Sequence, residues 1–380
     1  MVSFKLSEEQ EAIRKLAKSF CEKEIIPIAA EYDEKEEIPW QVVNKAFDAG
    51  LMNLEVPVEY NGQGQDAVTV AIVAEELAYG CIGINGTFGA NGLALMPILL
   101  AATPEQKQKY LAPFCAKAQL AAFCLTEPGA GSDAGAVSTT AQLKGDEYVI
   151  NGLKHFITNG GVANLYTVFA KTDPTKGVKG ISAFIVPADL PGVKRGKKEK
   201  KMGDRASDVA EVIFEEVRVP KGNLLANEGD GFKIAMMTLD RTRPAVAASA
   251  VGLARRALEE AIKYSKERVQ FGKPICANQA IQFMLADMAI KVEAARALTW
   301  QACWMIDEGL RVSKVGAMAK CFASDTAMAN AIDGLQIFGG YGYMREYPME
   351  KLVRDAKILQ IYEGTNQIQR MVIAGALLGM

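Results

Sequence analysis

The chain is poor in the residues that metal and hydrolytic chemistry need. It has one histidine, His155, in 380 residues, and neither an H-E-x-x-H nor a C-x-x-C motif, so the usual zinc sites are not expected. A serine hydrolase triad would have to use His155, and no G-x-S-x-G turn accompanies it. We therefore expect no bound metal, and hydrolytic chemistry is disfavoured.

The chain also lacks an excess of charge of either sign. Its 43 basic and 45 acidic residues give a formal charge of -2, which excludes the long-range field that non-specific nucleic-acid binding requires. We find no run of roughly twenty apolar residues. The N-terminal residues have neither the hydrophobic stretch of a signal peptide nor the Arg-rich bias of a transit peptide. The expectation is a cytoplasmic protein that binds neither nucleic acid nor a membrane.

Cysteine usage fits the same compartment. The seven cysteines are odd in number and scattered, which predicts free thiols in a reducing environment: Cys21, Cys81, Cys115, Cys124, Cys276, Cys303 and Cys321.

What the chain does have is length and apolar content, with 49% hydrophobic residues. This exceeds what one core normally organises, so two or three domains are expected. Residues 1–120 have a helical pattern. Capping boxes at Ser7–Gln10 and Thr103–Gln106 each pair a side-chain acceptor with a glutamine three residues later.

The pattern changes at about residue 121. Short runs rich in β-branched and aromatic residues follow, separated by Gly, Pro and Asp, and they predict strands at 121–125, 139–144, 148–151, 166–171, 180–186 and 212–219. Lys144–Glu147 suits a hairpin connection. The runs lie too close together for βαβ crossovers, so residues 121–230 are predicted to form an antiparallel β-barrel or sandwich, and a Rossmann fold is excluded.

Long helices return in residues 231–380. Helices are predicted at 246–268 and around 368–378, and two further helices carry apolar stripes that we assign to the core: Ile281, Leu285, Met288, Val292 and Ala295, and then Val315, Met318, Phe322, Ala329 and Ile332. A four-helix bundle is the natural architecture. The predicted class is therefore α+β multidomain, with a helical domain, a β domain and a bundle in that order.

One carboxylate stands out near the C-terminus. Glu363 lies between Tyr362 and Gly364 and is followed by hydroxyl and amide side chains. A glycine permits close approach of a ligand, and a desolvated glutamate has its pKa raised toward the range useful for proton abstraction. A helix N-cap or a solvated surface group is the alternative.

Two segments of the β domain can serve a ligand. Residues 125–135 contain three glycines spaced G-x-G-x-x-x-G, and no helix is expected after them, so they fail the dinucleotide fingerprint. Backbone N–H groups of such a loop can still bind a phosphate or a flavin edge, although a merely tight β-domain loop fits equally well. At 156–161 a flat ring can stack on Phe156 while Thr158 reaches its polar edge.

Three further segments accompany the bundle. Asp240–Pro244 places two arginines and a carboxylate just ahead of the first predicted bundle helix, where a surface ion pair is the alternative. Arg268–Pro274 ends that helix. Its glycine and proline are explained by helix termination, but Gln270 and Phe271 are not. Gln336–Tyr343 has more glycines than a helix end requires.

Taken together and in order, these segments resemble the acyl-CoA dehydrogenase family over essentially the whole chain. The matching motifs are residues 126–133, 157–160, 268–272, 336–340 and 361–365. The family's architecture, a helical domain, a β domain and a four-helix bundle, agrees with the order predicted above.

The resemblance implies non-covalently bound FAD between the β domain and the bundle, with part of the site supplied by a neighbouring subunit of a homotetramer. By similarity the cofactor-binding residues are Phe123, Leu125, Thr126, Gly131, Ser132, Phe156, Ile157, Thr158, Arg268, Gln270, Phe271, Gln336, Phe338, Gly339, Gly340, Thr365 and Gln367. The substrate-binding residues are Ser132, Asp240, Arg243, Tyr362 and Gly364. Phe156 stands where many members have tryptophan.

The resemblance also gives Glu363 a task. It would remove the α-proton of an acyl-CoA thioester while a hydride leaves the β-carbon for flavin N5, giving a trans-2-enoyl-CoA. One branch of the family carries its base at the position of Thr242, and threonine cannot serve. Electrons would pass to an electron-transferring flavoprotein. A related oxidase that uses oxygen, or a branched or alicyclic substrate, stays open, and residues 88–95 resemble the floor of the acyl pocket.

Overall fold

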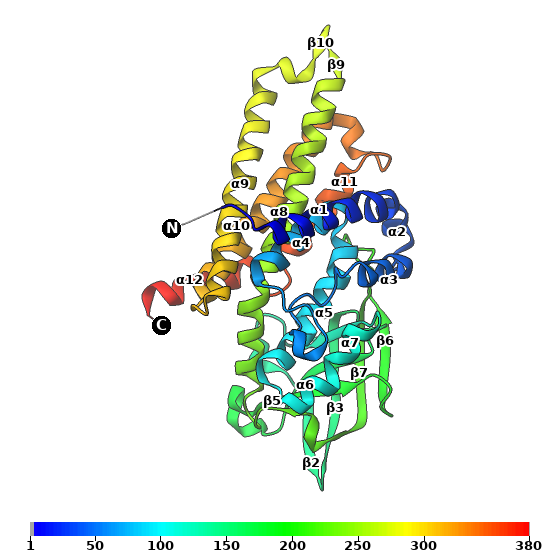
Figure 1. The fold of residues 1–380 in the computed structure, drawn as a ribbon, viewed down its shortest axis with the longest axis vertical. Helices are drawn as coiled ribbons and strands as arrows, with labels where there is room; N and C mark the ends of the chain where they lie inside the picture. Colours follow the sequence, from blue (N-terminus) through cyan, green and yellow to red (C-terminus); the bar gives the residue numbers. More distant parts are fainter. Residues whose placement is uncertain (1–3, 380) are drawn as a thin grey trace.

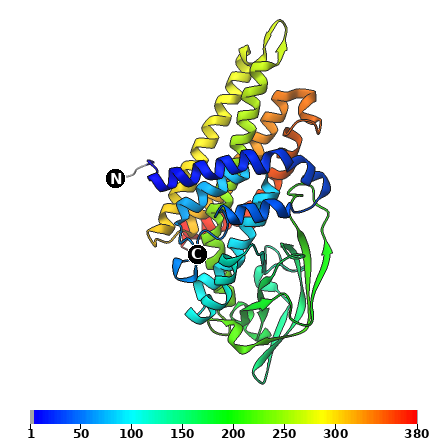
Figure 2. The same cartoon turned by 45° about the vertical axis from the view of Figure 1, so that its right-hand side comes forward.

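The computed structural model describes residues 4–379 and arranges them along one long axis (Figure 1). The large β sheet lies at one end, the long helices of the bundle and a short β hairpin reach the other, and the N-terminal helices lie across the middle (Figures 1 and 2). The predicted fold class is confirmed.

The N-terminal region is helical. Its α-helices are α1 (Glu8–Phe20), α2 (Ala29–Lys35), α3 (Trp40–Asp48), α4 (Ala67–Gly80), α5 (Ile82–Ala101), α6 (Pro104–Tyr110) and α7 (Ala112–Ala116). Both capping boxes form: the Ser7 and Thr103 hydroxyls accept from the backbone of Gln10 and Gln106, whose side chains accept from the cap N–H groups.

Helix α5 differs from one sequence expectation. It is long and apolar enough to cross a membrane, with a mean hydropathy of 1.3, which the search for uninterrupted apolar runs missed. Because 61% of that window is buried inside the protein, α5 has the burial of a core helix.

The middle region forms an eight-stranded sheet, ordered β6-β7-β3-β2-β4-β5-β8 with β1 beside β4. The strands are β1 (Ala121–Cys124), β2 (Thr140–Lys144), β3 (Glu147–Thr158), β4 (Leu165–Lys171), β5 (Ile181–Pro187), β6 (Val193–Lys198), β7 (Val209–Pro220) and β8 (Leu224–Leu225). The predicted hairpin is confirmed by the Lys144 to Glu147 pairing. The sheet is mainly antiparallel, but β1 and β2 each pair with β4 in parallel.

Strand β6 escaped prediction because five of its six residues are charged or glycine, and only one is β-branched. It pairs along one side with β7 and is mostly exposed, so cross-strand hydrogen bonding rather than burial of its side chains holds it in the sheet.

The bundle begins with a helix longer than predicted. Its helices are α8 (Gly231–Glu267), α9 (Gln279–Asp307), α10 (Ser313–Phe338), α11 (Met349–Leu359) and α12 (Asn366–Leu378), and the hairpin β9 (Val269–Gln270) and β10 (Lys273–Pro274) joins α8 to α9. The expectation that Asp240–Pro244 precedes the first bundle helix is wrong, because α8 continues through Pro244. A proline inside a helix costs about 3 kcal/mol, and burial of the helix on both sides of it offsets that cost.

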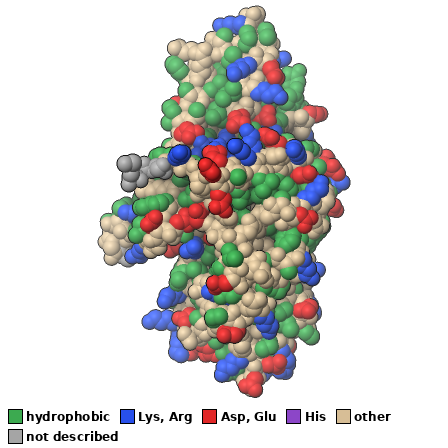
Figure 3. Space-filling view, viewed as in Figure 1, with side chains coloured by type: hydrophobic (Ala, Val, Ile, Leu, Met, Phe, Trp, Pro, Cys, Tyr) green, Lys and Arg blue, Asp and Glu red, His purple; other side chains and the backbone are tan. Residues whose placement is uncertain are grey.

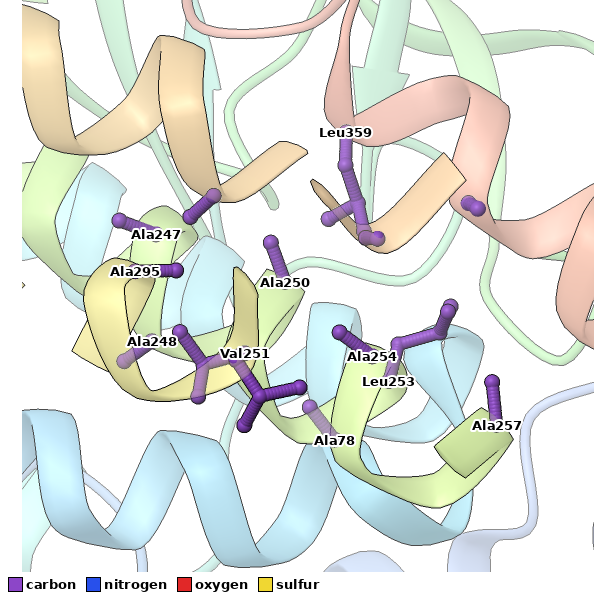
Figure 4. Packing of buried hydrophobic residues seen from close by; sticks show 14 of the residues in the cluster. Ala78, Ala247, Ala248, Ala250, Val251, Leu253, Ala254, Ala257, Ala295 and Leu359 are labelled. Atoms are coloured by element: carbon purple, nitrogen blue, oxygen red, sulfur yellow. The ribbon is translucent and has the colours of Figure 1, made fainter. Parts of the chain in front are cut away.

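Small side chains fill the bundle core. Ala247, Ala250, Ala254 and Ala257 of α8 lie together with Leu359 of α11 (Figure 4). Small residues let the helix axes approach closely, and such cores tolerate little change in volume.

Only one of the two predicted core stripes is confirmed. On α9, Met288, Val292 and Ala295 are buried, whereas on α10 Phe322 is 41% and Ile332 is 50% exposed. The buried face of α10 consists of small residues such as Ala319, Ala323, Ala327 and Ala331. Phe322 and Ile332 therefore face outward in a single chain, whereas Ile337 and Phe338 at the end of α10 are buried.

The surface and the cysteines follow expectation. Acidic and basic side chains are interspersed over the face seen in Figure 3, as a near-zero net charge requires. All seven cysteines are free thiols.

Candidate active site

A large cavity lies where the three regions meet. Its volume is about 950 Å³, and its wall comes from the loop after α3, helices α4, α5 and α8, the loops of the sheet, and the turn after α11. This is at the upper end of the range for small-molecule sites. The turn after α11 carries Glu363.

Glu363 is held in a conformation that non-glycine residues seldom adopt. Its φ is 52°, and that of Gly364 is 93°, so the turn reverses within two residues. Its side chain lines the cavity and accepts a hydrogen bond from the Thr242 hydroxyl, 2.6 Å from Glu363 Oε2. Its backbone N–H donates to no acceptor within residues 4–379. The positive φ of Glu363 is a strained backbone conformation, and such strain clusters at functional sites.

The carbonyl groups of this turn are fixed from several sides. Arg243 Nε donates to the Glu363 carbonyl oxygen at 3.4 Å, and Gln369 Nε2 donates to the carbonyl oxygens of Glu363 and Gly364 at 3.2 and 2.8 Å. Lys320 Nζ donates to the Gly364 oxygen at 2.9 Å. The turn is thus anchored through its carbonyls, which leaves the Glu363 carboxylate and N–H free to face the cavity.

The surroundings of Glu363 tune its acidity. Burial raises the pKa of its carboxyl, while the hydrogen bond from Thr242 and the charges of Arg243 and Lys320 lower it, and the rise prevails. Burial likewise raises the pKa of Tyr362, so its phenol stays neutral. A carboxylate with a raised pKa is a stronger base.

The loop after β1 is tied to β3 by a buried ion pair. Lys154 and Glu127 are 2.8 Å apart, and their side chains are 0% and 3% exposed. Glu127 also accepts from the backbone N–H groups of Ser138 and Thr139 at 2.5 and 3.0 Å. Burial pushes the pKa of Glu127 up, but the Lys154 ammonium and the hydrogen bonds from Ser138 and Thr139 together outweigh it and bring that pKa to about 2. The loop is thereby held against the cavity.

A bulge in β3 turns Phe156 toward the cavity. The pairing of β3 with β7 slips between Lys154 and Ile157, and Phe156 has a φ of 57°. The His155 N–H donates to the Thr126 carbonyl oxygen at 2.9 Å, which joins the two predicted loops. Phe156 is 61% exposed and lines the cavity, as stacking on a ligand requires.

The structure brings about half of the predicted site residues together at this cavity. Those that line it are Phe123, Leu125, Thr126, Gly131, Ser132, Phe156, Ile157, Thr158, Arg243, Tyr362, Glu363, Gly364 and Thr365. Asp240 does not line it. That carboxylate accepts from Arg243 Nη1 at 2.8 Å and from the Ser313 hydroxyl, and so supports Arg243.

A second set lies elsewhere. Arg268, Gln270, Phe338, Gly339 and Gly340 line a separate pocket of about 510 Å³ at the C-terminal end of α8. With about 1.5 Å of rise per residue, the end of α8 lies roughly 38 Å from Thr242. Within one chain the two sets do not meet.

The second pocket has the features of a binding surface. Arg268 lies over the ring of Tyr341, 5.3 Å from its centre, and no atom lies within 4 Å of a side chain added at Gly339 or Gly340. Phe271, at the tip of the hairpin, is fully exposed with a φ of 52°. Gln336 and Gln367 are exposed and line neither pocket.

The donor groups of the cavity suit a flavin cofactor. The hydroxyls of Thr126, Ser132 and Thr158 line the cavity and make no hydrogen bond to any residue from 4 to 379. They lie near a free aromatic face, that of Phe156. Unpaired donors beside an aromatic surface are what a polar-edged ring system needs.

Sequence reasoning overlooked three residues that contact the Glu363 turn or its side chain. Thr242 was considered only as a place where a base is missing, and Gln369 and Lys320 were not considered. Lys320 has a signal in the sequence, because it is the single charged residue between Val315 and Ser324. Gln369 has none.

One group of candidate metal ligands occurs among the described residues, namely His155, Glu199 and Glu211. Glu211 approaches His155 Nδ1 at 3.3 Å and Glu199 approaches Nε2 at 3.7 Å. Both His155 Nδ1 and Glu199 Oε1 are buried and have no hydrogen-bond partner among the described residues.

Comparisons with known proteins agree with this geometry. Three family profiles match consecutive parts of the chain: the acyl-CoA dehydrogenase N-terminal domain over residues 7–118, the middle domain over 122–217 and the C-terminal domain over 229–378.

Individual relatives are similar over nearly their whole length. An acyl-CoA dehydrogenase of Bacillus subtilis is 48% identical, covering 98% of this chain and 99% of its own, and the mitochondrial short-chain specific acyl-CoA dehydrogenase of Rattus norvegicus is 46% identical, covering 99% and 92%. The solved structure of butyryl-CoA dehydrogenase from Megasphaera elsdenii has a TM-score of 0.97 at 46% identity, covering 99% and 100%.

A structure described as the electron transferring flavoprotein of Acidaminococcus fermentans also has a TM-score of 0.97, at 51% identity and the same coverage. The chain therefore belongs to the acyl-CoA dehydrogenase family, whose members are oxidoreductases with FAD as cofactor.

Proposed function

We propose that the protein oxidises a saturated acyl-CoA to the trans-2-enoyl-CoA, with Glu363 as the base that removes the α-proton. The observation that carries this is the state of Glu363 itself. Its carboxylate faces a large cavity, has a pKa raised by burial, and accepts a single side-chain hydrogen bond from the described residues, that of Thr242.

The α C–H of a thioester is a weak acid, so the carboxylate needs help. The Glu363 N–H, which has no acceptor of its own among the described residues, is a donor for the thioester oxygen, where negative charge develops as the proton leaves. Tyr362 and the apolar wall exclude water and keep the carboxylate basic. Bound FAD supplies the acceptor for the hydride that leaves the β-carbon.

For the cofactor we propose the residues of both pockets. The hydroxyls of Thr126, Ser132 and Thr158 and the ring of Phe156 would hold the flavin and its ribityl chain, and Thr365 would complete that side. Arg268, Gln270 and Phe271, with the segment Gln336–Gly340, would hold the pyrophosphate and adenine of an FAD bound by a neighbouring copy.

This sharing requires an oligomer, which we propose is a homotetramer. Two observations support it. The predicted cofactor residues lie in two pockets that do not meet within one chain, and large apolar residues of α10 and α12, such as Phe322, Met371 and Leu378, are exposed. Exposed apolar surface on this scale marks an interaction site.

For the substrate we propose acyl groups of short to medium length. Gly86 and Gly89 of α5 line the cavity, and no atom lies within 4 Å of a side chain added at Gly89. The relatives named for butyryl-CoA and short-chain substrates agree with this range. Ser132, Arg243, Tyr362 and Gly364 would contact the thioester and the pantetheine chain.

For the electrons we propose transfer to an electron-transferring flavoprotein in the cytoplasm. The support is the similarity to the Acidaminococcus structure described under that name and to a bacterial acyl-CoA dehydrogenase. The test against an oxidase is direct: hydrogen peroxide released at the rate of turnover would contradict transfer to a protein acceptor.

The decisive experiment uses the purified flavoprotein with a panel of saturated, branched and alicyclic acyl-CoA thioesters and an artificial electron acceptor. Anaerobic addition of a substrate should bleach the flavin absorbance. Glu363→Gln should bind the same thioester and bleach far more slowly, and bleaching at an undiminished rate would refute the assignment of the base.

A further inference from the structure

Lys320 is a charged residue in the interior of the bundle. It lies on α10, its side chain is 0% exposed, and its neighbours Ala319 and Cys321 are buried as well. A buried ammonium usually has a carboxylate partner, because an unpaired buried charge is costly. Lys320 forms no ion pair within the described part of the chain, so its presence there calls for another explanation.

The contacts of Lys320 point to the turn that carries Glu363. Its Nζ donates to the Gly364 carbonyl oxygen at 2.9 Å and to Asn366 Oδ1 at 3.0 Å. Asn366 is itself fixed, since its Nδ2 donates to Ser324 Oγ at 2.9 Å. Hydrogen bonds from an ammonium are roughly twice as strong as those between neutral groups. Lys320 therefore holds the residues on the C-terminal side of Glu363.

The charges around Lys320 come from three elements. The Glu363 carboxylate faces it from the turn and Arg243 from α8, and Cys321 and Asp325 lie on its own helix. Burial lowers the pKa of Lys320 to about 8, while Glu363 raises it more than the other groups do. Below about pH 8 the side chain is thus a cation that faces the carboxylate of the base.

We propose that Lys320 is a positioning residue for the dehydrogenation. Its ammonium fixes the base-bearing turn through Gly364 and Asn366, and its charge favours the ionised form of Glu363. The proposal rests on the proposed role of Glu363 as the base. It explains why a lysine that forms no direct ion pair with a described residue lies in a core of small residues.

A lysine that served only folding would behave differently. Its removal would change stability or cofactor content, but it would leave the pH dependence of catalysis where it was. If the charge of Lys320 supports the carboxylate, its removal raises the pKa of Glu363, and the acid limb of kcat/KM moves to higher pH.

The test uses the FAD-loaded protein and two variants. Lys320→Met is an uncharged near-isostere, and Lys320→Gln keeps a donor without the charge. Lys314→Met, at an exposed position of the same helix, is the matched control. The pH profile of kcat/KM is measured with a saturated acyl-CoA and an artificial acceptor, together with the flavin content of each variant.

We expect the acid limb to move up by about one pH unit in both Lys320 variants, which is about a tenfold loss of kcat/KM below the limb. The loss should disappear well above the limb, and Lys314→Met should match the wild type. Limbs that coincide in all four proteins would overturn the proposal. So would failure of both Lys320 variants to fold, since that would assign the ammonium to folding.

The same assay separates this inference from the proposed function. Glu363→Gln with full activity would refute the proposed role of Glu363 as the base, on which this inference rests. Glu363→Gln with little activity, beside an unshifted limb in Lys320→Met, would refute the role of Lys320 alone.

Discussion

The hydrogen bond between Thr242 and Glu363 offers a direct test of how the base is tuned. The Thr242 hydroxyl lies 2.6 Å from Glu363 Oε2 and stabilises the carboxylate. Thr242→Val keeps the shape of the side chain and removes the donor. The pKa of Glu363, already raised by burial, should rise further.

The size of the effect follows from the contact. A hydrogen bond to a charged group is worth about 1.5–3 kcal/mol, and one pKa unit corresponds to about 1.36 kcal/mol. The pKa of Glu363 should therefore rise by about 1–2 units. Because the base works as the carboxylate, the acid limb of kcat/KM should move up by the same amount, and activity well above it should be unchanged.

The helix supplies its own control. Thr238, one turn earlier on α8, is buried, and its hydroxyl has no hydrogen-bond partner. Thr238→Val removes an equivalent hydroxyl without touching the base, and it should leave the pH profile unchanged. A limb in Thr242→Val that moves no further than in Thr238→Val would refute the reasoning.

Five further outcomes are expected. Glu363→Gln should lower kcat by about 10²–10⁴-fold. It should also raise the melting temperature more at pH 8 than at pH 5, because a carboxyl whose pKa is raised on folding destabilises the folded protein as the pH rises. Lys154→Met leaves Glu127 buried and unpaired, and urea titration should show a loss of about 3–5 kcal/mol. In the wild type, Glu127 contributes to the free energy of unfolding because its pKa is about 2 in the folded protein, below its ordinary value of 4.5. On acid titration this contribution should be lost as the pH falls from 4.5 to about 2. Arg268→Ala should lower the flavin content after gel filtration while the free energy of urea unfolding of the apoprotein falls by no more than about 1 kcal/mol, because Arg268 forms no ion pair with a described residue and contacts only the ring of Tyr341 through its charge. Gly89→Leu should lower kcat/KM for medium-chain more than for short-chain thioesters, since its side chain would enter the acyl end of the cavity.

Sequence patterns predicted helices and strands correctly where interactions between neighbouring residues determine the structure. Ser7 and Thr103 start helices because a hydroxyl and a glutamine three residues later satisfy backbone groups of their own turn. Short runs of β-branched and aromatic residues, separated by Gly, Pro and Asp, likewise predicted strands from neighbouring residues alone. Strand β6 was missed because its pairing partner, not its composition, decides its structure.

The sequence by itself determined the order of the three regions and the family, and it led to the proposal of Glu363 as the base. These inferences depend on the types of residues and on their order along the chain, and both can be taken directly from the sequence. Tertiary structure decided the rest. It extended α8 through Pro244 and left Phe322 and Ile332 of α10 exposed, since burial depends on which faces of neighbouring helices meet.

Tertiary structure also decided which groups act on Glu363. Thr242 and Lys320 lie 121 and 43 positions away along the chain, and only the packing of α8 and α10 against the turn brings them to it. It likewise separated Arg268 from the cavity. Spacing in a sequence does not encode such distances, because they are set by the length and crossing of helices that pack only after folding.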